Sequence, residues 1–87
     1  MPTAARKSRL QERPEIRAVL AVNVIAMRGA KGWSQDALAL ECGLHRTFIA
    51  HVERRARNVS LESLEKIAVA LQVPTFQLLV PPAVDGV

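Results

Sequence analysis

The chain has 87 residues, which is enough for one small domain and too few for a second hydrophobic core. Apolar residues make up 49% of it and aromatic residues only 3%, so the composition predicts an aliphatic, helical core. The formal net charge of +4 fits a polyanionic partner and an ordinary solvated charged surface about equally well. The single cysteine excludes an internal disulfide bond.

The basic residues are unevenly placed along the chain. Residues 1–13 carry four cations against one acid, whereas the rest carry eight cations against seven acids. Because this first segment also has little apolar content, we expect a flexible basic arm over residues 1–13. One folded domain is expected over residues 14–80, followed by a short tail over residues 81–87.

The apolar run after Pro14 predicts a first helix that extends to residue 27 or 28. Proline suits a first helical turn, since the N–H that it lacks has no partner there. The main core stripe consists of Leu20, Val24 and Met27. Val22 and Ile25 lie off that stripe, so this helix should bury more than one face, and Gly29 and Gly32 should end it. The run is too short for a bilayer and no small-residue cleavage site follows, so we expect neither a membrane span nor a signal peptide.

The next segment has the cap signals of a second helix. Ser34 is a strong N-cap, and Trp33 and Leu38 have the spacing of a hydrophobic staple. The side chains expected to face inward are Leu38, Ala39 and Cys42. Gly43 should end the helix in a left-handed conformation. We expect Cys42 to be a buried, inert thiol, which is consistent with a cytoplasmic protein.

A third helix is expected from His45 or Arg46 to about Arg54. Ile49 and Val52 should face the core. The opposite face carries cations and small side chains: Arg46, Thr47, Ala50, His51 and Arg54. A short helix with this division of side chains, placed after a tight glycine turn, is suited to the major groove of DNA.

Two further helices are expected before the tail. Ser60 should cap the first of them, whose core stripe consists of Leu61, Leu64, Ile67, Ala68 and Leu71. Pro74 and Thr75 should open a last short helix over residues 76–80, which the prolines that follow end. No segment has the alternation of a strand.

The central run reads Gly32-Trp33-Ser34-Gln35-Asp36-Ala37-Leu38-Ala39, then Cys42-Gly43-Leu44-His45-Arg46-Thr47-Phe48-Ile49, then Val52-Glu53-Arg54. It closely resembles the helix-turn-helix of the XRE family, the lambda-repressor-like regulators. The resemblance spans about residues 21–79. It implies an all-α, five-helix lambda-repressor-like domain that binds double-stranded DNA and uses no cofactor.

Within this family the motif is most similar to the branch that controls restriction–modification genes. The matching residues are Arg46-Thr47-Phe48-Ile49, then Glu53-Arg54, then Arg57-Asn58. The resemblance implies a homodimer that binds operator repeats upstream of its own gene and of the endonuclease gene. Phe48 departs from the tyrosine usual in this branch, and Arg55 from the glycine or asparagine usual in the family. If φ of Arg55 is positive, its conformation costs about 1 kcal/mol.

Eight residues are the candidate DNA contacts: Gln35, Arg46, Thr47, Ala50, His51, Arg54, Arg57 and Asn58. Gln35 lies in a first helical turn, where side-chain and backbone donors can together hold a phosphate. Arg46 can grip a guanine edge with two hydrogen bonds, and the Thr47 methyl can touch a thymine methyl. The resemblance implies base contacts for these two residues and backbone contacts for Arg57 and Asn58.

A lone domain of this type reads only a few base pairs, so we expect a homodimer. The expected dimer surface is the apolar C-terminal part: Phe76, Leu78, Leu79 and Val80. Part of this set should fill the core and the rest should face the partner. The apolar first helix is the alternative surface.

Two other functions remain open. A generic XRE-type repressor or antitoxin has the same fold. A helical adaptor that binds protein instead of DNA is supported by Leu40, an apolar side chain on an expected polar face. No nucleophile–base pair or glycine-rich phosphate loop appears, so we expect neither an enzyme nor a small-molecule substrate. Cys42, His45 and His51 are one ligand short of a structural zinc set, so we expect no metal site.

Overall fold

The computed structural model describes residues 15–82, so the expectations for the arm over residues 1–13 and for most of the tail lie outside the described residues. The described part is all-helical, as the sequence predicts. Its elements in chain order are α2 (Ile16–Ala30), α3 (Gln35–Cys42), α4 (Arg46–Glu53), α5 (Leu61–Leu71) and the 3-10 helix η1 (Thr75–Leu79). No helix in this part is long and apolar enough to cross a membrane.

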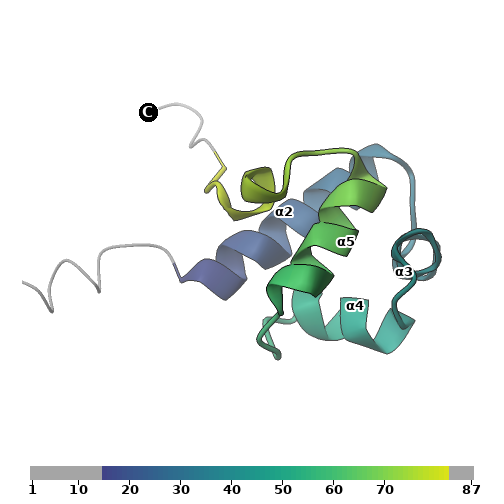
Figure 1. The fold of residues 1–87 in the computed structure, drawn as a ribbon, viewed down its shortest axis with the longest axis horizontal. Helices are drawn as coiled ribbons and strands as arrows, with labels where there is room; N and C mark the ends of the chain where they lie inside the picture. Colours follow the sequence, from purple (N-terminus) through teal and green to yellow (C-terminus); the bar gives the residue numbers. More distant parts are fainter. Residues whose placement is uncertain (1–14, 83–87) are drawn as a thin grey trace, which may run out of the picture.

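Helix α4 is supported by two other helices. It packs against α2 on one side and α3 on the other, while α3 also packs against α5. In Figure 1, α4 lies along the lower edge of the molecule and α3 is seen end-on beside it. The short element η1 packs on α2 and α5. Within residues 15–82, no other element packs on the face of α4 that carries Arg46, Thr47 and Arg54.

The predicted core stripes account for the observed core. It consists of Leu20, Val24, Leu38, Ala39, Cys42, Ile49, Val52, Leu64, Ile67, Ala68, Leu71 and Leu78. Leu61 was predicted to join them, but it is 82% exposed. It is the first residue of α5 and lies beyond the edge of the core. Helix α2 does bury more than one face, with Val19, Ala21 and Asn23 on either side of the main stripe, but Val22 and Ile25, which suggested this, are both exposed.

Helix α2 begins and ends later than the sequence predicts. Its N-cap is Glu15, whose carboxylate accepts hydrogen bonds from the backbone N–H groups of Arg17 and Ala18. The helix continues through Gly29 to Ala30, so that glycine does not end it. The chain turns at Gly32, where φ is 72°. Only this second glycine needs the left-handed conformation that a residue without Cβ adopts freely.

The last element is a 3-10 helix over Thr75–Leu79 instead of the predicted α-helix over 76–80. The described chain therefore has four α-helices, not five. A segment of five residues leaves no room for a continuing i−4 ladder, and its bonds span three residues, as in Gln77 N–H to Pro74 C=O at 2.9 Å. Buried Asn23 of α2 donates to the carbonyls of Leu78 and Val80 at 2.8 and 2.9 Å. This amide ties η1 to α2 across the core.

Candidate nucleic-acid interface

Both ends of α3 form as the sequence predicts. Ser34 Oγ accepts a hydrogen bond from the Ala37 N–H at 3.0 Å and so caps α3. Gly43 has φ 69°, and the N–H groups of Gly43 and Leu44 bond to the carbonyls of Leu40 and Ala39 at 3.3 and 3.0 Å. These bonds close a Schellman motif, which fixes the direction in which the chain enters α4.

Helix α4 divides its side chains as expected. Ile49 and Val52 are buried, whereas the opposite face carries five residues of which Arg46, Thr47 and Arg54 are exposed and Ala50 and His51 are half-buried. Among residues 15–82, Nδ1 of His51 is buried and has no hydrogen-bond partner. Any contact of this imidazole with an external partner must therefore use Nε2.

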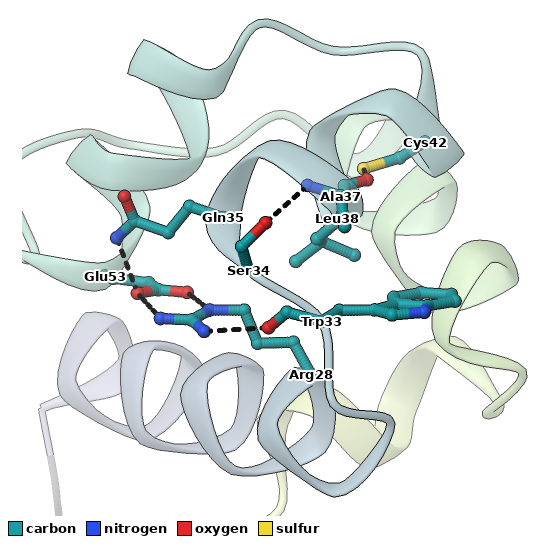
Figure 2. Close-up of polar contacts among 8 residues, drawn as sticks. All are labelled: Arg28, Trp33, Ser34, Gln35, Ala37, Leu38, Cys42 and Glu53. Carbon is teal, nitrogen blue, oxygen red and sulfur yellow. Dashed lines mark hydrogen bonds and ion pairs between the residues drawn. The ribbon is translucent and has the colours of Figure 1, made fainter.

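A polar network joins α2, α3 and α4 behind this face. The Arg28 guanidinium makes two hydrogen bonds to the Glu53 carboxylate, Nε to Oε2 at 2.6 Å and an Nη to Oε1 at 2.9 Å. A third Arg28 bond goes to the Trp33 carbonyl at 3.0 Å. Gln35 donates from Nε2 to Glu53 Oε1 at 2.8 Å. Figure 2 shows the Glu53 carboxylate between the Gln35 amide and the Arg28 guanidinium.

The electrostatics of this network favour the charged forms of both ionic groups. The Glu53 side chain is only 5% exposed and that of Arg28 21%. Burial by itself raises the pKa of Glu53, but hydrogen bonds from Arg28 and Gln35 and the nearby positive charge outweigh it and hold the pKa below its ordinary value. The hydrogen bond with Glu53 in turn raises the pKa of Arg28. The network therefore stays ionised and fixes the start of α3 relative to the end of α4.

The sequence did not reveal that Arg28 and Glu53 form this pair. The one available signal was that Glu53 is the only acid among the clustered cations of α4 and the following loop. Gln35, a predicted phosphate contact, is half-buried and uses one of its two amide N–H groups inside the network. The second N–H makes no hydrogen bond within the described residues and remains available.

The loop after α4 begins with a second Schellman motif. The N–H groups of Arg55 and Ala56 bond to the carbonyls of Val52 and His51 at 3.1 and 2.9 Å. Arg55 has φ 61°, so it is in the left-handed conformation for which the sequence predicts a cost.

The rest of this loop is held by two side-chain contacts. The Arg57 guanidinium lies over the Phe48 ring, 5.8 Å from its centroid. Asn58 Oδ1 accepts a hydrogen bond from Arg17 of α2 at 3.2 Å. The first contact holds Arg57 beside α4, and the second holds Asn58 beside the start of α2.

The predicted site residues therefore come from three neighbouring segments: the start of α3, the free face of α4 and the loop that follows. The four residues of the predicted dimer surface do not share one environment. Leu78 is fully buried, so it belongs to the part of the set that was expected to fill the core and cannot itself face a partner. Leu79 is half-buried, whereas Phe76 and Val80 are exposed. Within residues 15–82 no group of three or more His, Cys, Asp or Glu side chains could hold a metal ion.

Comparison with known proteins identifies the family. Residues 24–78 match the HTH_3 family model, described as helix-turn-helix. The chain belongs to the HTH_3 helix-turn-helix family. The matched range contains α3, α4 and the turn between them, so family membership rests on the same segments that carry the predicted site.

Three known proteins are similar over half or more of this chain. The crystal structure of the hypothetical transcription factor NHTF from Neisseria is 51% identical, with a TM-score of 0.77 and 78% of each chain covered. Control protein C.BamHI of Bacillus amyloliquefaciens is 56% identical over 46 residues, 53% of this chain and 57% of that protein. The restriction–modification controller C.Esp1396I, bound as a tetramer to its natural 35 base-pair operator, is 31% identical, with a TM-score of 0.69, 77% of this chain and 92% of that one covered. The chain is thus related to restriction–modification controller proteins.

Proposed function

We propose that this protein is a sequence-specific regulator of transcription that binds double-stranded DNA with α4 in the major groove. The observation that carries the proposal is the free face of α4, where Arg46 and Thr47 are exposed at the start of the helix. The helix is supported from behind by buried Ile49 and Val52 and by the Glu53 network. A rigid helix with polar donors at its N-terminal end suits the reading of base edges.

Each candidate residue then has a specific task. We assign Arg46 and Thr47 to base edges, with Ala50, His51 and Arg54 further along the same groove. Arg57 and Asn58 reach the DNA backbone after α4, and Gln35 reaches it before α4 through its second amide N–H. A phosphate held by the second N–H of Gln35 would be connected to Glu53 through the Gln35 amide, whose first N–H already bonds to that carboxylate. Contact with the DNA backbone and the position of α4 are therefore coupled.

The relatives support a proposal for the regulated genes. C.Esp1396I is described as a restriction–modification controller in complex with its natural operator. This chain keeps the Arg46-Thr47 pair, the Glu53-Arg54 pair and the Arg57-Asn58 pair that resemble that branch. We therefore propose a non-enzymatic controller of restriction–modification genes in the cytoplasm. A generic repressor or antitoxin of the same fold is the second candidate.

We further propose that the protein acts as a homodimer. Leu79 of η1 lines an apolar groove of about 330 Å3 together with residues from the starts of α2 and α5, among them Ile16 and Leu61. Both of these apolar side chains are exposed to water in a monomer, which is unfavourable. The proposed dimer surface is this groove with the exposed side chains of η1, so that pairing doubles the length of DNA read.

The DNA-binding proposal is tested on Arg46→Ala. The probes are a duplex selected by the wild-type protein from a random library, and unselected duplex. Arg46→Ala should weaken binding to the selected site by about 1–3 kcal/mol and far less on unselected DNA, because a bidentate base contact is lost. Arg57→Ala is the matched control, since a lost backbone contact weakens both probes alike. No mobility shift of the wild type at low salt would refute DNA binding and favour the adaptor that exposed Leu40 suggests.

Sedimentation at micromolar concentration tests the dimer. Leu61→Asp should give a folded monomer, because its side chain lies outside the core. Leu40→Asp, an equally exposed position on α3, is the control and should remain dimeric. Phe76→Asp reports whether the exposed part of η1 also contributes. A dimer that survives both Leu61→Asp and Phe76→Asp would refute the proposed surface.

A further inference from the structure

One acidic side chain lies beside the proposed base-reading arginine. Asp36 is the second residue of α3, and Arg46 is the first residue of α4. Arg46 Nε is 3.3 Å from Asp36 Oδ1, and the two side chains are 61% and 74% exposed. The contact therefore joins the helices on either side of the turn at the surface that faces the proposed ligand.

Two ordinary explanations for Asp36 account for only part of its pairing with Arg46. An acid in a first helical turn interacts favourably with the helix dipole, but that effect needs no arginine opposite. An exposed ion pair adds little stability, so folding alone does not explain the pairing. A carboxylate on a DNA-facing surface also repels phosphate and weakens general affinity for DNA. The main effect of the contact is therefore on the Arg46 guanidinium.

The geometry of the guanidinium gives it a specific consequence. The Arg46 nitrogen in this ion pair is Nε; the pair lacks hydrogen-bond geometry, and no hydrogen bond from a terminal nitrogen of Arg46 is found within residues 15–82. A guanine edge is recognised by two parallel donors, to O6 and N7. An arginine restrained through Nε keeps its two terminal nitrogens for such an edge, and the restraint removes rotamer freedom before DNA arrives.

We propose that Asp36 is a positioning residue that orients Arg46 for base recognition and sets the base selectivity of the protein. This inference rests on the proposed function. Asp36 acts in two ways that favour the correct site over other DNA. It holds the guanidinium in the orientation that a guanine accepts, and its negative charge disfavours use of the same guanidinium as a nonspecific phosphate contact.

The experiment uses the full chain and a thermodynamic cycle of wild type, Asp36→Asn, Arg46→Ala and the double variant. Glu41→Gln is the matched control, because it removes one exposed negative charge from the same helix. Dissociation constants are measured on the selected duplex, on that duplex with the preferred G·C pairs replaced one at a time, and on unselected duplex. Asp36→Glu tests whether a carboxylate at this position restores the wild-type behaviour.

Asp36→Asn should lower the preference for the correct base pair about two- to fivefold, the effect of one exposed ion pair. Affinity for unselected duplex should rise at the same time, since one repulsive charge is gone. The loss of preference should vanish in the Arg46→Ala background, and Glu41→Gln should not change it. A DNA-binding Asp36→Asn protein with unchanged preference, or an equal loss without Arg46, would overturn the role of Asp36 alone. A wild-type protein that binds no duplex would overturn the proposed function with it.

Discussion

Replacing Arg55 with glycine should make the protein more stable. Arg55 is held at φ 61° by the Schellman motif that ends α4, and an L-residue pays about 1–2 kcal/mol for that conformation. Glycine adopts it freely but loses about 0.5–1 kcal/mol more backbone entropy on folding. The difference predicts a gain of about 1 kcal/mol in the free energy of unfolding, or about 4–8 °C in Tm.

Two control variants separate backbone strain from charge, and all are measured by urea and thermal unfolding. Arg55→Ala removes the cation but keeps the strain, so its stability should stay close to that of the wild type. Arg54→Gly makes the same chemical change at the neighbouring cap, where φ is −92°, and should destabilise the protein. If Arg55→Gly is no more stable than Arg55→Ala, the strain argument is wrong. If Arg54→Gly stabilises equally, the gain has another origin.

Four further outcomes are expected, three from the structure and one from the charge of residues 1–13. Glu53→Gln should cost about 3 kcal/mol, because it leaves a largely buried guanidinium unpaired, whereas exposed Glu65→Gln should change stability by less than about 0.5 kcal/mol. Since the pKa of Glu53 is held below its unfolded value, its contribution is present at neutral pH and is lost as pH falls below about 4, which acid titration of the two variants should reveal. Leu78→Ala should cost about 2–5 kcal/mol on unfolding and Phe76→Ala much less, as their burial differs completely. Removing residues 1–13 should flatten the slope of log K against log salt for DNA binding, and an unchanged slope would exclude a role for their charge.

The sequence by itself determined the features that depend on near neighbours in the chain. Ser34 and Ser60 cap the helices that they were predicted to cap, because an N-cap bond spans only three residues. Gly43 takes its left-handed turn for a similarly local reason. The apolar periodicities of α3, α4 and α5 also identified most of the core, since one face of a helix can be read from spacing alone. Family membership follows from the same local pattern.

The tertiary structure decided what depends on how the helices pack. Arg28 and Glu53 are 25 positions apart, and Asn23 lies 55 and 57 positions from the carbonyls it binds, so no local pattern pairs them. Gln72 ends α5 at φ 62° without the glycine that would have announced it. Leu61 and Leu78 look alike in the sequence, but one is exposed and the other is fully buried. Periodicity gives the direction of a side chain around its own helix. Burial and pairing depend on which other element covers that side chain, and only the packing of the whole chain determines this.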